Sequence, residues 1–183
     1  MHWLNFKRYK SDVAKQTVPP HLNAAEFARH YADKPQADTE EYLSLSGEMC
    51  WDAVVLCAHR SGALSKAKCK QLWLTVFDKQ YKHFVSPDDT EIRTMADMLR
   101  APQGCFIGIF SMRDAAAPRL LHAMIGTGAG FAAGNKNLCI GVGGAVGWEN
   151  LNLARDLRWQ PEGGFLRQGD NEVLRIFYRP FPV

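Results

Sequence analysis

The N-terminal half of the chain carries its apolar residues at helical spacing. Cys50, Val54 and Cys57 fall on one face at positions i, i+4 and i+7, which predicts a helix over 50–60. A longer apolar stripe, rich in aromatic residues, predicts a second helix over 66–84 whose stripe packs into the core.

Capping patterns predict two further helices. Asn23 is followed three residues later by Glu26, the spacing of a capping box, and this predicts a short helix over 24–32. Ser86 is followed by a proline and two acidic residues, which is typical of a helix start. This helix is expected to stop at Pro102.

Short apolar runs of strand type follow in the C-terminal half. They lie at 105–110, 120–127, 131–134, 138–142 and 173–178. Because the helices come first and do not alternate with the strands, we expect an α+β fold with N-terminal helices packed on a C-terminal antiparallel sheet. No repeat or boundary divides the chain, so residues 1–183 are expected to form a single domain.

Composition narrows the classes of partner. The chain of 183 residues is 46% hydrophobic and 22% charged, with a net charge of +3. No basic stripe is interleaved with aromatic residues, and no apolar run reaches the length of a membrane span, so neither nucleic acid nor a membrane span is expected. Residues 1–20 form a basic arm, either a solvated tail or a segment that binds a partner.

The N-terminus has no apolar signal-peptide core. We therefore expect synthesis in the cytoplasm without a cleaved signal, and any secretion would need a specialised system. The five cysteines have no C-x-x-C spacing, so neither a disulfide framework, a metal site nor any other cofactor is expected. The glycine-rich stretch 126–147 lacks the spacing of a dinucleotide fingerprint.

Cys50 is the cysteine whose position suggests chemistry. It stands at the predicted start of a helix, after a small polar run that ends in Gly47 and before Trp51. Backbone N–H groups and the positive end of the helix dipole stabilise a thiolate there. The alternative is that Cys50 is a buried core residue, as we expect for the other four cysteines.

His122 is the candidate partner of this thiol. Among the six histidines it is the one that begins an apolar strand, at 122–128. A histidine at a strand end that points towards a helix N-terminus can act as the general base for a thiol. The alternative is a structural histidine.

These segments, 44–57 and 105–143, resemble the papain-like or transglutaminase-like cysteine hydrolases. In that plan a cysteine begins a helix packed on an antiparallel sheet, a histidine begins one strand, and an asparagine or aspartate ends the next. The resemblance implies a papain-like core, with a hairpin that returns Asn137 or Asn135 to His122 as the residue that orients the imidazole. Asp156 and Asp170 are alternative orienting residues.

Two departures from the plan point to its compact members. Ser44 stands where papain-like proteases place a glutamine that helps to hold the oxyanion, and the interval between the cysteine and the histidine is short. Both suit bacterial effectors or toxins that deamidate or cleave one particular amide. The resemblance implies a protein or peptide substrate, and a cognate inhibitor protein as a further partner.

The expected function is therefore that of a cysteine-dependent amide hydrolase: a deamidase, amidase or peptidase. His122 would take the proton of Cys50, the thiolate would attack an amide carbonyl, and the backbone N–H of Cys50 would help to hold the oxyanion. The substrate groove is expected to be lined by Ser44, Gly47, Trp51 and Trp148. The alternative is a non-catalytic α+β interaction protein, such as an adaptor or a toxin-neutralising partner.

Overall fold

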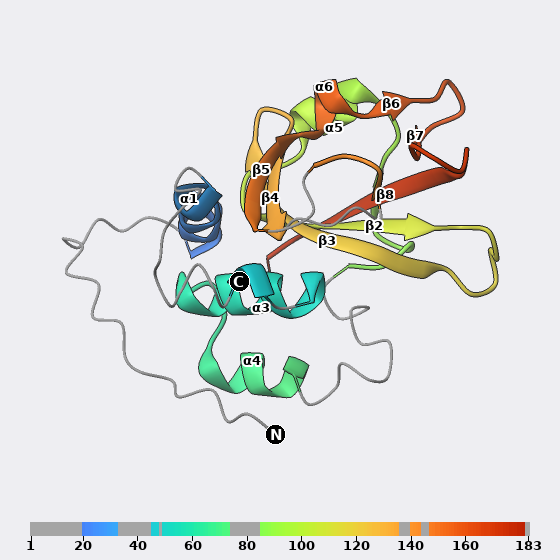
Figure 1. The fold of residues 1–183 in the computed structure, drawn as a ribbon. Helices are drawn as coiled ribbons and strands as arrows, with labels where there is room; N and C mark the ends of the chain where they lie inside the picture. Colours follow the sequence, from blue (N-terminus) through green and yellow to red (C-terminus); the bar gives the residue numbers. More distant parts are fainter. Residues whose placement is uncertain are drawn as a thin grey trace.

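The computed structural model describes residues 20–32, 45–47, 49–73, 85–135, 140–143 and 147–181. Within these residues helices dominate the N-terminal part and strands the C-terminal part, and every strand pairing is antiparallel, so the predicted α+β class is confirmed (Figure 1). The helices are α1 (Pro20–Ala32), α3 (Cys50–Arg60), α4 (Lys66–Trp73), α5 (Met95–Arg100) and α6 (Leu153–Asp156). The strands are β1 (Thr90–Ile92), β2 (Cys105–Ser111), β3 (Arg119–Gly128), β4 (Phe131–Asn135), β5 (Trp148–Asn152), β6 (Arg158–Trp159), β7 (Phe165–Leu166) and β8 (Val173–Pro180).

The first two predicted helices are present. Helix α3 has the predicted bounds, and α1 contains the predicted segment 24–32 but begins earlier, at Pro20. Helix α4 confirms the beginning of the predicted helix 66–84, whose remainder lies outside the described residues, as does the basic arm up to residue 19. None of the helices in the described ranges is both long and apolar enough to cross a bilayer.

The helix predicted to start at Ser86 is wrong. The Ser86 side chain accepts a hydrogen bond from the backbone N–H of Asp88, and the Asp89 carboxylate accepts one from the backbone N–H of Ser86, so these residues close a turn. The chain then forms β1, in which Ile92 pairs with Ile176 of β8. The helix starts only after Thr94, which caps α5 in a capping box with Asp97.

Four of the five predicted strands are confirmed as β2, β3, β4 and β8. The strand predicted at 138–142 is wrong for its described part, since residues 140–142 are not in a strand. Gly141 has a φ of +78°, a backbone conformation that interrupts an extended run. Strands β1, β5, β6 and β7 were not predicted.

The sheet curls strongly (Figure 1). Its strands follow the order β5-β4-β3-β2-β8-β7-β6, and β1 also pairs with β8. In a flat sheet β5 and β6 would lie roughly 29 Å apart. The chain from Asn152 at the end of β5 to Arg158 at the start of β6 spans at most about 20 Å even when extended, and here it contains α6. The two ends of the sheet therefore approach one another.

Two buried clusters occupy the two faces of this sheet. Along β2, Phe106 and Phe110 belong to one cluster, and Ile107 and Ile109 belong to the other, as the alternation of side chains in a strand requires. The helix-side cluster joins α1 and α3 to strand residues that include Phe106, Phe110, Ala123, Ile125, Ala133, Trp148 and Phe177. The inner cluster, on the concave face, includes Ile92, Met98, Ile107, Ile109, Met124, Leu153, Phe165 and Ile176.

Candidate functional site

Cys50 is the first residue of α3, as predicted. Met49 precedes it in an extended conformation, with φ −62° and ψ 149°, and its side chain makes no capping hydrogen bond. The first backbone hydrogen bond of the helix runs from the N–H of Ala53 to the carbonyl of Met49. Cys50 therefore lies in the first turn of the helix, where the positive end of the helix dipole favours an anion.

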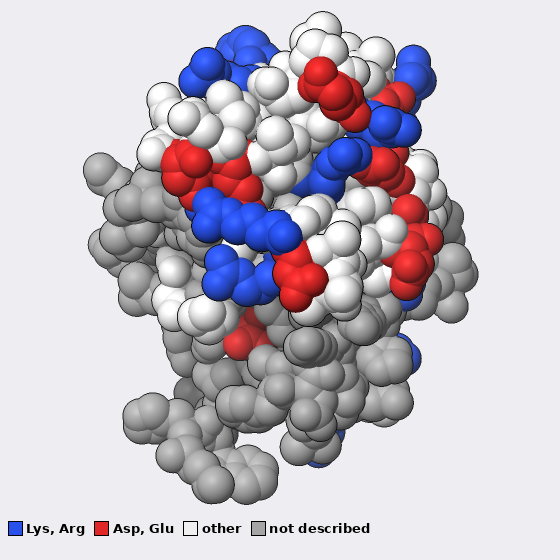
Figure 2. Space-filling view, turned by 90° about the vertical axis from the view of Figure 1, so that its right-hand side faces the viewer, with Lys and Arg blue, Asp and Glu red and all other residues white. Residues whose placement is uncertain are grey.

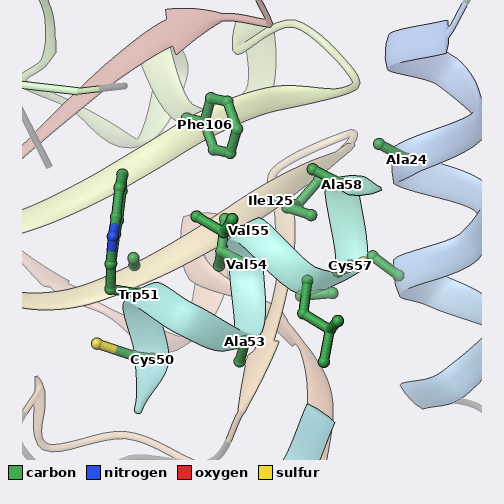
Figure 3. Close-up of a cluster of buried hydrophobic side chains, with 14 of the residues drawn as sticks. Ala24, Cys50, Trp51, Ala53, Val54, Val55, Cys57, Ala58, Phe106 and Ile125 are labelled. Atoms are coloured by element: carbon green, nitrogen blue, oxygen red, sulfur yellow. The ribbon is translucent and has the colours of Figure 1, made fainter. Parts of the chain in front are cut away.

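The start of α3 lies close to the surface. The Met49 side chain is 72% exposed, whereas Cys50 and Trp51 are 8% and 7% exposed and belong to the helix-side cluster. Figure 3 shows Cys50 and Trp51 at one end of α3 and Cys57 towards the other. Gly47, three residues before Cys50, is exposed and would leave an added Cβ in open space.

The other described cysteines have the character of core residues. Burial raises the pKa of Cys57 far above its ordinary value, that of Cys69 to about 11 and that of Cys105 to about 12. These three side chains are therefore thiols at neutral pH. Cys139 lies outside the described residues.

His122 lies inside β3 rather than at its head, because the strand begins at Arg119. It is paired with Ile109 of β2, and so it points to the same face as Ile109. A Cβ added at Gly134 would lie 3.2 Å from Cγ of Met124 and 3.6 Å from Nε2 of His122, which places both side chains on one side. That side is the inner face.

The imidazole of His122 is buried there without compensation. The residue is 1% exposed, and its Nδ1 has no hydrogen-bond partner among the described residues. Burial lowers the pKa of His122 to about 4, so the ring is neutral at physiological pH. No aspartate or asparagine orients this nitrogen in the described part of the chain.

The structure therefore does not bring His122 to Cys50. The neighbours of His122 along β3, Ala123 and Ile125, face α3, whereas His122 itself faces the other way. The pair stays a prediction from the sequence, and its geometry depends on which face β3 presents at position 122.

The proposed orienting residues are also dispersed. Asn135 pairs with Trp148, whose indole N–H donates to the carbonyl of Ala28 in α1, so both strand residues face the helix side. Asp156 pairs with Arg155 on α6. Asp170, between β7 and β8, pairs with Arg113 and Arg167. Asn137 and Ser44 lie outside the described residues.

A buried carboxylate cluster was not foreseen. The Glu172 side chain pairs with Arg113 and Arg167, and it accepts a hydrogen bond from the hydroxyl of Ser111. Hydrogen bonding to Arg167 holds the pKa of neighbouring Asp170 well below its ordinary value. These residues come from two segments far apart in the chain, 111–113 and 167–172, and no sequence pattern shows that the two segments meet.

Charges of opposite sign are also interleaved on the surface. Figure 2 shows Lys and Arg side chains beside Asp and Glu side chains over one face, without a separate patch of either sign. Ion pairs between oppositely charged side chains include Arg175–Glu91 and Arg179–Asp89. Over the described ranges, no group of three or more histidines, cysteines and acidic residues is arranged to hold a metal ion.

A second polar site that sequence reasoning missed lies between α1 and the turn that joins β3 to β4. A cavity of about 420 Å³ is lined there by Arg29, Thr127 and Asn150, among others. Its residues come from α1, β3, β4, β5, the β3–β4 turn and the segment between α5 and β2, and the contacts of α1 with β3, β4 and β5 bring Arg29 to the strand residues.

Known proteins provide no guide to these sites. No protein-family model matches the chain, and no curated protein or solved structure matches it either.

Proposed function

We propose that the protein is a cysteine-dependent amide hydrolase with Cys50 as its nucleophile. The observation that carries the proposal is the position of this thiol as the first residue of α3, next to an exposed Met49 and at the positive end of the helix dipole. The three other described cysteines lack this position and are held as thiols by burial.

The chemistry uses groups of this helix start. Thiolate attack on an amide carbonyl would form a tetrahedral intermediate, and the backbone N–H of Cys50 would donate to its oxyanion. The leaving nitrogen would take a proton from water, or from His122 in the triad version, and depart as ammonia or an amine, leaving a thioester. Water would then hydrolyse the thioester to a carboxylic acid and return the thiol. Deamidation and peptide cleavage share these steps and differ in the amide that is attacked.

A triad that includes His122 requires this side chain to lie on the α3 side of the sheet. The register of β3 against β2 shifts between Ile109 and Phe110, so that Leu121 is the extra residue of a bulge. If this bulge moved past His122, the side-chain alternation would turn the imidazole to the α3 side. The triad version of the proposal requires that arrangement.

The papain-like plan is part of the same proposal. It is supported by the helix-side cluster, in which α1 and α3 share buried contacts with β2, β3 and β4. Asn135 lies on this side too, in the strand after His122, where the resemblance places an orienting residue.

The first experiment measures the alkylation rate of each cysteine by iodoacetamide with mass spectrometry, from about pH 5 to 9. Cys50 should react at least about tenfold faster than the other cysteines near neutral pH. The matched controls are Cys50→Ala, which should remove the fast site, and Cys57→Ala, which should leave it. Preferential labelling of another cysteine would contradict the assignment.

The second experiment assays ammonia release and new termini from peptides that contain glutamine and asparagine. Both products should depend on Cys50, while Cys50→Ala stays folded because position 50 opens a helix at the edge of the core. His122→Gln decides the role of the histidine. A large loss of Cys50 reactivity supports the triad, and unchanged reactivity shows that the thiol is activated without His122.

A further inference from the structure

The cavity between α1 and the β3–β4 turn contains an arginine without an anionic partner. Nη2 of Arg29 donates to the backbone carbonyl of Thr127 at 2.5 Å. Within the described ranges no carboxylate pairs with Arg29, whereas Arg113, Arg175 and Arg179 all form ion pairs. A guanidinium has five N–H donors, so most of the donor capacity of Arg29 remains for a ligand.

The neutral side chains around Arg29 also offer donors. The Thr127 hydroxyl donates to Oδ1 of Asn150 at 2.7 Å. This bond fixes the orientation of the amide, so the Nδ2 group of Asn150 remains as a donor. Gln103 lies against Gly128, with side-chain atoms 3.7 and 3.8 Å from a Cβ added there. Over the described residues, neither Nδ2 of Asn150 nor the Gln103 amide has a hydrogen-bond partner.

The remaining lining gives the site its size and its apolar side. Phe131 and the backbone of Gly128 and Ala129 complete the wall, and the cavity of about 420 Å³ falls within the usual range of small-ligand sites. Among the described residues, no acidic side chain lines it. As far as the structure describes the chain, the site therefore combines a cation that forms no ion pair, amide donors and an aromatic ring.

We propose that this cavity binds a carboxylate ligand of about amino-acid size, with the carboxylate on the guanidinium of Arg29. The fork of a guanidinium matches the two oxygens of a planar carboxylate, and Nδ2 of Asn150 adds a further donor. A phosphate dianion would face a single positive charge here. The carboxylate could come from the C-terminal residue of a peptide or from a free dicarboxylate, and Phe131 would pack on the apolar remainder.

The experiment titrates the full-length protein with N-acetylphenylalanine, glutarate and inorganic phosphate by calorimetry, and follows the backbone amides of Gly128 and Ala129 by NMR. N-acetylphenylalanine represents a peptide C-terminus, and glutarate represents a free dicarboxylate. At least one carboxylate should bind saturably below about 10 mM and shift both amides. Phosphate should bind much more weakly.

Two variants test the assignment in different ways. Arg29→Gln removes the charge and should weaken carboxylate binding at least about tenfold. Asn150→Asp keeps an acceptor for the Thr127 hydroxyl but places a negative charge on the wall, and it should weaken binding to a similar extent. Arg119→Gln, at the exposed opposite end of β3, is the matched control and should bind as the wild type does.

Urea unfolding of each variant shows that it is folded before titration. The proposal is overturned if no carboxylate binds saturably, if Asn150→Asp and Arg29→Gln bind as well as Arg119→Gln does, or if phosphate binds more tightly than both carboxylates. No step involves a thiol, so the result is independent of the role of Cys50.

Discussion

The two faces of the sheet bury different functional side chains. On the helix side, the indole N–H of Trp148 donates to the carbonyl of Ala28, and Cys50 lies where a helix start meets the surface. On the inner face, His122 is buried with Nδ1 unsatisfied and its pKa lowered to about 4. The helix-side cluster thus contains a thiol at a helix start, whereas the inner cluster contains an imidazole whose charge is suppressed by burial.

The largest expected loss of stability comes from a substitution in the helix-side cluster. Trp148→Ala removes a fully buried ring and the donor to Ala28, and should lower the free energy of unfolding by about 3–5 kcal/mol. Trp159→Ala is the control, because Trp159 is only partly buried at the edge of the inner cluster, and it should cost less. Urea unfolding measures both, and equal losses would contradict the described packing.

The next effect tests the inner face through pH. Because the pKa of His122 is lower in the folded state than the ordinary value of 6.5, the unfolded state takes up the proton first as pH falls. Above pH 6.5 His122 is neutral in both states and does not lower the free energy of unfolding. As pH falls from 6.5 towards about 4, the free energy of unfolding should fall by about 3 kcal/mol.

His122→Leu is the matching variant for this measurement. It places an apolar side chain in the inner cluster and should flatten the pH dependence of urea unfolding between these two values. A variant with the same acid sensitivity as the wild type would show that other groups carry the effect.

A smaller effect compares two cysteines of one helix. Cys57 is fully buried, so Cys57→Ser should cost about 1–3 kcal/mol by burying a hydroxyl. Cys50→Ser should cost less than about 1 kcal/mol, because a hydroxyl at a helix start can reach water or backbone groups. Thermal unfolding of the two variants ranks them, and the reverse order would place Cys50 deeper in the core.

The smallest effect compares the helix starts on the two faces. Helix α5 begins with the Thr94–Asp97 capping box, whereas Met49 gives α3 no side-chain cap. Thr94→Ala should destabilise by about 1 kcal/mol, and Met49→Ser should stabilise by a similar amount. If Met49→Ser had no effect in urea unfolding, the serine hydroxyl would not act as a cap of α3.

Local patterns predicted the elements whose signals lie within one segment. The bounds of α3 follow from its apolar spacing, and β2 and β8 from runs of strand-forming residues. The helix predicted at Ser86 failed because its capping residues equally suit a turn, and because an edge of β8 was available to pair with β1. Pairing with a distant strand has no local signature.

The candidate site shows the same limit more sharply. The position of Cys50 at a helix start could be predicted, because Gly47 and the apolar pattern after it mark that start. The face of His122 could not, since one extra residue at Leu121 reverses the alternation along β3. The setting of Arg29 depends on how α1 meets a turn far along the chain, which periodicity cannot show.

The pairing of β2 with β8 has a consequence for the order of synthesis. Strand β2 is buried along its whole length and apolar in most positions, and one of its edges pairs with β8, which the ribosome makes only after β3 to β7. Until then the nascent chain presents an apolar strand with a free edge, the kind of surface on which unfinished chains associate. Formation of the β2–β3 hairpin covers only the edge of β2 that faces β3. The pairing at the centre of the sheet is therefore completed last.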